Sequence, residues 1–334
     1  MNGNQYVRHA MSFAVGDRWR FSRRSVSAAF TASKMRLMMY GMTKAVDRFL
    51  NLLEARCLKA PDGEANIYPL IGSLTFDVVA ETACGLYLDV QHKPNDQYFD
   101  SARSFMLNIV ESAYQRIGQF FSEVKSILAM TCMLELQFGC EPLTALSRKS
   151  EPIVVLREKD QSSLLDAKVP KELLRWREFR ERTDDQGEFE TVSASGSICA
   201  FCLAKYPGVQ ERVRQEVNAV YEKYGGFTYD AVRDLTYTRQ TVDESLRLYP
   251  PVVAFSPEKK AARHPLAFQP FGLGARNCVG MRMAQIETIL IAAMLVHRFR
   301  LHLGSRHANG ELERKTESII ASPKNGVWIR AEKI

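Results

Sequence analysis

One cysteine in this chain lies in a setting that favours a thiolate. Cys278 stands in "FQPFGLGARNCVG", between Gly274 and Gly280 and two residues after Arg276, and an apolar run follows from about Val279. If that run is a helix, its first N–H groups and the nearby guanidinium favour ionised sulfur. Glycines let the backbone turn and leave space. A flat, bulky group can then lie over the sulfur, which acts as ligand or nucleophile; the alternative is a buried cysteine at a helix start.

Two further pairs of residues have helical spacing. Glu244 and Arg247 stand three apart in "VDESLRLYPPV", and Trp19 and Arg23 stand four apart in "GDRWRFSRRSVSAAF". Residues at these spacings share one face of a helix. Taken alone, the first pair is typical of a surface ion pair. The second is typical of an amphipathic basic helix with a half-buried tryptophan.

The cysteine loop has the form F-x-x-G-x-R-x-C-x-G, with fixed positions at Phe271, Gly274, Arg276, Cys278 and Gly280. It resembles the haem-binding loop of the cytochrome P-450 family, in which a long buried helix follows the loop. The two pairs resemble the family's E-x-x-R and W-x-x-x-R helices. "TFDVVAETACG", "LAKYPGVQERVRQEV" and "PKNGVWIR" resemble further pieces, the last of them in animal microsomal members.

The resemblance covers nearly the whole chain and implies a fold. We expect residues 1–334 to form a single cytochrome P-450-like domain, mainly α with a few short β-strands. We also expect this domain to be incomplete. It would lack the family's N-terminal anchor region and internal blocks near residues 171–196 and 254–256.

The resemblance also implies a cofactor, haem b, with Cys278 as the axial iron ligand. Arg276, Trp19 and Arg23 would contact the haem propionates, because carboxylates on a buried cofactor need cationic partners. Glu244 and Arg247 would form a structural pair. Phe271, Gly274 and Gly280 would shape the loop.

The implied reaction is monooxygenation. One atom of O2 enters an apolar organic substrate (a lipid, steroid or xenobiotic), and the other leaves as water. Electrons would come from an NADPH-cytochrome reductase, because the chain has no G-x-G-x-x-G after a strand and no P-loop. The resemblance alone implies the cytosolic face of the endoplasmic reticulum membrane.

Two internal regions depart from the family. Residues 171–196 are charged and irregular, where the family has an apolar helix with an acid-threonine pair that relays protons to oxygen. Counting back places that pair at Glu190 and Thr191, so Thr191 is a catalytic candidate, and a threonine in a solvated loop is the favoured alternative. Near residues 254–256 the family has an arginine that contacts the E-x-x-R pair. We therefore expect Glu244 and Arg247 to be imperfectly satisfied buried charges.

Three other interpretations stay open. The chain can be a non-catalytic remnant that binds haem or misfolds. It can be a peroxide isomerase of the same family, which needs no external electrons. A helical interaction module without a cofactor would make the Cys278 loop a coincidence.

Helical patterns dominate the elements that must position these residues. A strand is predicted at 298–303, and an Asn-Gly turn into a strand at 322–330. A central buried helix is predicted from Met281 to Val296, and Gly85 is a candidate C-cap. The other predicted helices cover residues 32–58, 68–86, 95–114, 206–226 and 229–251.

Composition sets broad limits. The 334 residues, 46% of them hydrophobic, suffice for a sizeable core. The net charge of +7 suits an acidic protein partner or a membrane surface, and no dense basic block favours nucleic acid. Seven scattered cysteines indicate a reducing compartment, and the Cys199–Cys202 spacing is typical of two buried residues rather than of a metal site. No apolar run is long enough to span a bilayer, so we expect no anchor.

Overall fold

A computed structural model describes residues 15–82, 87–93, 186–251, 268–317 and 320–334. The chain divides into two compact units, Met1–Ala29 with Asn95–Gly187 and Phe30–Pro94 with Glu188–Ile334. In the first unit the main described element is α2 (Gly16–Ser27). The predicted helix at 95–114, the Gly85 cap and the block near 254–256 lie outside the described residues.

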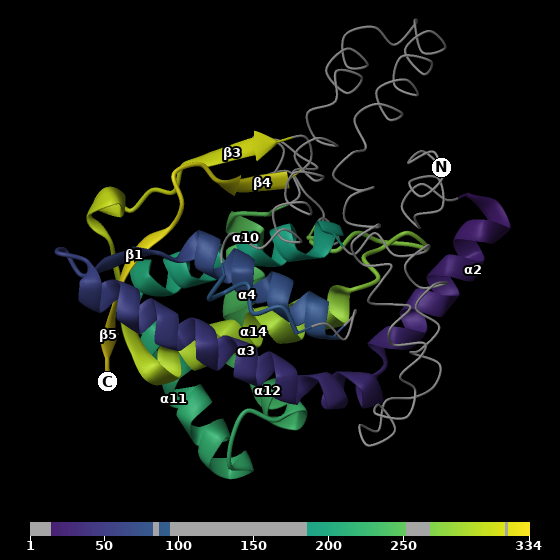
Figure 1. The fold of residues 1–334 in the computed structure, drawn as a ribbon, viewed down its shortest axis with the longest axis horizontal. Coiled ribbons are helices and arrows are strands. Elements are labelled where there is room, and N and C mark those ends of the chain that lie inside the picture. Colours follow the sequence, from purple (N-terminus) through teal and green to yellow (C-terminus); the bar gives the residue numbers. More distant parts are fainter. Residues whose placement is uncertain (1–14, 83–86, 94–185, 252–267, 318–319) are drawn as a thin grey trace, which may run out of the picture. The chain divides into compact units, whose positions relative to one another are not determined.

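Four long helices form the centre of the second unit (Figure 1). They are α3 (Ala32–Lys59), α4 (Ile67–Thr82), α10 (Gln186–Lys205) and α14 (Met281–Arg298). A β-carbon built on Gly196 of α10 would lie 3.4 Å from Ile71 of α4 and 3.7 Å from Ile291 of α14. Helix α10 therefore packs closely between α4 and α14. Among the described residues, none of the helices combines the length and apolarity that a bilayer crossing requires.

The helices predicted at residues 32–58 and 281–296 are confirmed as α3 and α14. On α3 the buried side chains recur every three or four residues, as in Met35, Met39 and Met42. On α14 twelve residues are buried, including every position from Ile286 to Val296. A helix that is apolar nearly all round is stable only when neighbours cover all its faces, and α14 is central for that reason.

Helix α11 (Pro207–Tyr224) begins with its proline and ends at Gly225, which has a φ of 66°, as the sequence predicts. The single helix predicted over 229–251 is wrong, because the chain forms α12 (Tyr229–Asp234) and α13 (Thr236–Leu248). The break between α12 and α13 is caused by a residue of α11. The Glu216 carboxylate accepts hydrogen bonds from the N–H groups of Tyr237 and Thr238 at 2.7 and 2.8 Å, which caps α13 at its own start.

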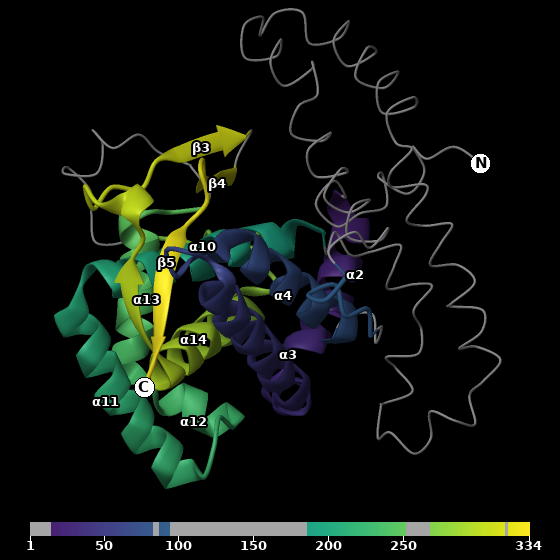
Figure 2. The ribbon, with the colours of Figure 1, turned by 60° about the vertical axis from the view of Figure 1, so that its left-hand side comes forward.

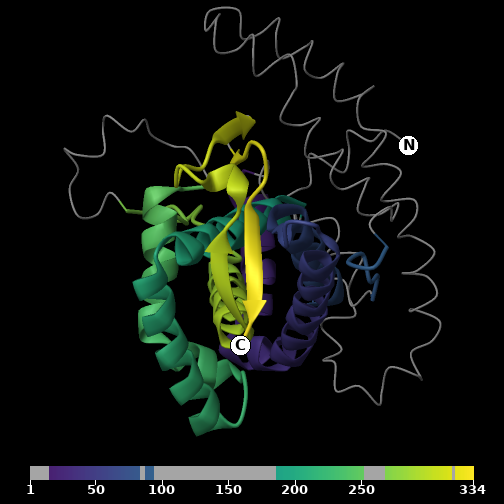
Figure 3. The same ribbon diagram turned by 90° about the vertical axis from the view of Figure 1, so that its left-hand side faces the viewer.

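Short antiparallel strands complete the second unit, so the fold is mainly α with a few short β-strands, as predicted. Strand β5 (Trp328–Lys333) pairs with β1 (Glu64–Asn66) and β2 (Phe299–Leu303), and β3 (Arg314–Glu317) pairs with β4 (Ile320–Pro323). Figure 2 shows β3 and β4 beyond one end of β5. In Figure 3 the yellow strands stand between the green helices and the purple-blue α3.

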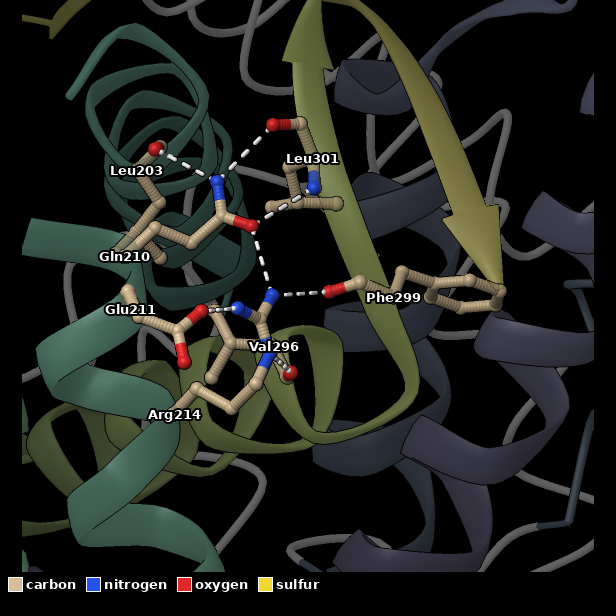
Figure 4. A network of polar contacts seen from close by, with 7 residues as sticks. All are labelled: Leu203, Gln210, Glu211, Arg214, Val296, Phe299 and Leu301. Carbon is tan, nitrogen blue, oxygen red and sulfur yellow. Dashed lines mark hydrogen bonds and ion pairs between the residues drawn. The ribbon is translucent and has the colours of Figure 1, made fainter. Parts of the chain in front are cut away.

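The far end of α14 is held by a buried polar network (Figure 4). The Arg214 guanidinium of α11 donates to the carbonyls of Val296 and Phe299, both at 2.9 Å. Beside it, the Gln210 amide donates to the carbonyls of Leu203 and Leu301 at 2.9 and 3.0 Å. The network thus satisfies carbonyls at the ends of α10 and α14 and ties both helices to β2.

Candidate haem-binding site

The Cys278 loop is closed by backbone hydrogen bonds. The Cys278 N–H donates to the Phe271 carbonyl at 2.8 Å, and inside this closure the Asn277 N–H donates to the Gly274 carbonyl at 3.2 Å. Gly272 and Gly274 have φ angles of +71° and +79°, which L side chains rarely adopt. The turn therefore needs its glycines, and it holds Cys278 at one end.

The helix after the loop begins at Met281, as predicted for the central buried helix. Gly280 is the N-cap of α14, and the Ala284 N–H donates to its carbonyl at 2.9 Å. Cys278 lies two residues before the N-cap and is half-buried. The positive end of the helix macrodipole favours an anion in this neighbourhood, and a thiolate is the form of cysteine that binds metals.

The loop leaves two large apolar side chains in water. Leu273 is 66% exposed and Phe268 is 41% exposed. At Gly274, no described atom beyond its two chain neighbours lies within 4 Å of the place where a β-carbon would stand. A flat apolar group can lie against such a surface, and burying it there would remove Leu273 from water. A soft sulfur ligand beside an exposed apolar loop fits haem.

The two cysteines of α10 lie in an environment unlike that of Cys278. Burial raises the pKa of both Cys199 and Cys202 to about 12, so both remain neutral thiols at physiological pH. Within the described ranges, no group of three or more His, Cys, Asp and Glu residues is arranged to hold a metal ion. Among the described cysteines, Cys278 thus has the setting that suits a ligand role.

The residues predicted to contact the propionates belong to different parts of the chain. Arg276 is exposed on the Cys278 loop, and Trp19 and Arg23 are half-buried, one helical turn apart on α2. The spacing places Trp19 and Arg23 on one face of that helix, as predicted. Helix α2 belongs to the first unit and the loop to the second, so their joint role remains a prediction.

The Glu244–Arg247 pair forms on α13. The guanidinium makes two hydrogen bonds to the carboxylate, with Nε–Oε2 at 2.7 Å and Nη2–Oε1 at 2.5 Å. These hydrogen bonds lower the pKa of Glu244. The expectation of buried charge is wrong, because the two side chains are 54% and 53% exposed and water reaches both.

Thr191 lies in a helix, so the interpretation as a solvated loop is wrong. It is half-buried in the second turn of α10, which begins at Gln186. Small residues explain the helix: Ser193, Ser195 and Gly196 allow close packing that outweighs their modest helix propensity. The serine hydroxyls bond back to the helix, as in Ser195 to the Thr191 carbonyl at 2.7 Å.

Two residues near these positions carry no clear signal in the sequence. The Tyr68 hydroxyl of α4 donates to the Glu190 carboxylate at 2.5 Å, across 122 residues of chain. No local pattern connects positions so far apart. Glu287 is 1% exposed on α14, nine residues after Cys278. Its only trace in the sequence is that it is the single carboxylate of α14, which is a weak signal.

Known proteins of one family match nearly the whole chain. The family model described as Cytochrome P450 matches residues 3–181, 186–255 and 253–329. Cytochrome P450 6a8 of Drosophila melanogaster is 24% identical over 389 residues, covering 96% of this chain and 75% of that protein. Cytochrome P450 6B4 of Papilio glaucus is 26% identical over 395 residues (95% and 75%). Cytochrome P450 3A29 of Sus scrofa is 23% identical over 359 residues (88% and 70%). The chain belongs to the cytochrome P450 family of haem-dependent monooxygenases.

Proposed function

We propose that this chain is a haem-thiolate monooxygenase that inserts one atom of O2 into an apolar organic substrate such as a lipid, steroid or xenobiotic. The observation that carries the proposal is the Cys278 loop, which presents a half-buried thiol and an exposed apolar surface before a helix N-terminus. Haem b, when bound through a thiolate, supplies the activation of oxygen. Two electrons come from an NADPH-cytochrome reductase, and two protons leave with the second oxygen atom as water.

The chain's own residues would divide the remaining tasks. Cys278 would ligate the iron, with Phe271, Gly274 and Gly280 shaping the loop around it. Arg276, Trp19 and Arg23 would neutralise the propionates. Glu244 and Arg247 would stabilise α13. Glu190 and Thr191, adjacent in α10, would be the acid and the hydroxyl through which protons reach oxygen.

We also propose that the chain lacks internal blocks that its relatives have, near residues 171–196 and 254–256. Two findings support this. The family model matches the chain in three separate segments. The first two are divided between residues 181 and 186, and the last two meet and overlap at residues 253–255. The alignments with relatives extend over 389 and 395 residues, although this chain has 334. The same breaks support a non-catalytic remnant as the second candidate. Location at the endoplasmic reticulum membrane belongs to the proposal as well.

The carbon monoxide spectrum of the reduced, haem-reconstituted chain tests the proposal. A strongly red-shifted Soret band is expected, because thiolate ligation produces it. Cys278→Ala should abolish the band, and the matched Cys57→Ala variant should keep it, since Cys57 is buried on α3. A folded wild-type chain without the band, or a band that survives Cys278→Ala, would overturn the ligand assignment. Turnover with reductase and NADPH then separates the monooxygenase from the remnant, and turnover with an organic peroxide alone would indicate an isomerase.

A further inference from the structure

A tyrosine on α4 contacts the carboxylate beside Thr191. Tyr68 lies in the first turn of α4 and Glu190 lies near the start of α10, and both are half-buried. The phenol O–H donates to Glu190 Oε1 at an O–O distance of 2.5 Å. A hydrogen bond from a neutral donor to a carboxylate is short and is stronger than one between two neutral groups. Tyr68 therefore holds the Glu190 carboxylate in a fixed orientation.

The packing of α4 on α10 makes this contact rigid. Two turns along α4, the Thr75 hydroxyl meets the Ser193 hydroxyl at 2.9 Å in a fully buried position. A β-carbon on Gly72 would lie 3.8 Å from the same Ser193 oxygen. Thus the two helices are already in close contact beside Tyr68. A tyrosine on a helix that is already fixed loses little further side-chain entropy when its hydroxyl orients the Glu190 carboxylate.

We propose that Tyr68 is a positioning residue for proton supply. It orients the Glu190 carboxylate so that protons pass through Thr191 to oxygen fast enough to complete its reduction. This inference rests on the proposed function. Glu190 and Thr191 are neighbours in sequence, so their side chains point about 100° apart around the helix. A carboxylate held toward α4 by Tyr68 is therefore kept on one side of the hydroxyl, and its range of movement is limited by the phenol.

The stoichiometry of oxygen reduction reports on proton supply. Without substrate, O2 that takes four electrons and four protons ends as two waters and consumes two NADPH. O2 that takes two electrons and two protons leaves as hydrogen peroxide and consumes one NADPH. A misplaced acid favours the second outcome, because the further protons arrive too slowly. The peroxide formed per O2 consumed therefore measures how well the acid is positioned.

The test compares three proteins in the haem-loaded full chain with NADPH-cytochrome reductase and no added substrate. Tyr68→Phe removes the hydroxyl alone, and we expect it to raise the peroxide share of consumed O2 by at least about twofold. Thr75→Val is the matched control, since it removes a buried hydrogen bond at the same helix pair without touching Glu190. It should lower the thermal unfolding midpoint at least as much as Tyr68→Phe and leave the peroxide share unchanged.

A third variant, Glu190→Gln, should raise the peroxide share by itself and make the Tyr68→Phe change silent. Equal peroxide shares in the wild type and in Tyr68→Phe would overturn the inference. So would an equal rise in Thr75→Val, because Tyr68 would then be a structural contact only. A wild-type chain with the thiolate spectrum but without NADPH consumption would overturn the proposed function, and the inference with it.

Discussion

The two ends of α14 are built in opposite ways. At its beginning, the Cys278 loop is closed by backbone hydrogen bonds, has two glycines with positive φ, and leaves Leu273 exposed. At its end, the carbonyls of Val296 and Phe299 both accept from the buried Arg214 guanidinium. One helix thus joins an open surface to a closed polar network.

The difference separates binding from stability. A loop that must accept a flat group cannot fill its own surface, so the exposed apolar area is left for the ligand to cover. The Arg214 network lies five turns away from the loop, because α14 has 18 residues and each turn takes 3.6. The comparison predicts that substitutions at the far end mainly change stability, and that those at the loop mainly change haem retention.

The largest effect is expected for Arg214→Met. The change leaves the carbonyls of Val296 and Phe299 and the Glu211 carboxylate without their donor, in a site where Arg214 is 6% exposed. Each buried carbonyl left without a donor costs about 1–3 kcal/mol of folding free energy, and the half-exposed Glu211 carboxylate adds little because water solvates it. Urea unfolding monitored by circular dichroism should show this as a lower midpoint.

The matched control is Arg247→Met, which removes the guanidinium of a half-exposed pair. We expect it to cost about 0.2–1 kcal/mol, since solvent screens that pair. If both variants lost the same free energy of unfolding, the Arg214 network would be no stronger than an exposed ion pair. The proposed contrast between the two ends of α14 would then be wrong.

A smaller effect is expected at the loop for Gly274→Ala. Space is not the obstacle, but the φ of +79° costs an L residue about 1–2 kcal/mol. Haem should dissociate faster from the variant, measured by transfer to an excess of apomyoglobin. Gly208→Ala on α11 is the control, because that position is equally open and helical. It should stabilise the protein by about 0.4–1 kcal/mol and leave haem retention unchanged. Faster haem loss from Gly208→Ala would show that global stability, rather than loop geometry, controls retention.

Local patterns predicted α3, α11 and α14, and they singled out the glycine turn before Cys278. The loop is encoded within ten consecutive residues, and glycines at the turn positions have few alternatives. The boundaries of α11 follow from Pro207 and Gly225 for the same reason. The predictions that were wrong concern elements whose structure depends on distant residues. The Glu216 carboxylate of α11 divides residues 229–251 into two helices, and no residue pattern inside that segment predicts this cap.

The error at Thr191 has a similar physical cause. Serines and glycine around it have weak helix propensity, so the segment resembles a loop when considered alone. In the fold these small residues are what α4 requires, because Gly196 lies against Ile71 and Ser193 contacts Thr75. The Tyr68–Glu190 contact was equally beyond reach, since a pair 122 residues apart leaves no periodic trace.

The smallest effect concerns the closed end of α14 and its response to pH. His297, in the last turn, hydrogen-bonds to Asn218 at 2.8 Å and stacks on Tyr221 with ring centroids 4.5 Å apart. Burial lowers the pKa of His297 below its usual 6.5. As the pH falls below 6.5, the unfolded state binds the proton first, so the free energy of unfolding decreases through that window. Above it His297 is neutral in both states and its contribution is fully present.

His297→Phe keeps a ring against Tyr221 and removes the titration. The decrease in urea midpoint between about pH 7.5 and pH 5.5 should therefore be smaller in the variant than in the wild type. An identical decrease in both proteins would mean that other groups carry the acid sensitivity. Because the Cys278 loop lies at the opposite end of the helix, haem retention at pH 7.5 should be equal in the two proteins. A change in retention would show instead that the two ends of α14 are coupled, and that the far end tunes the ligand loop as well as anchoring it.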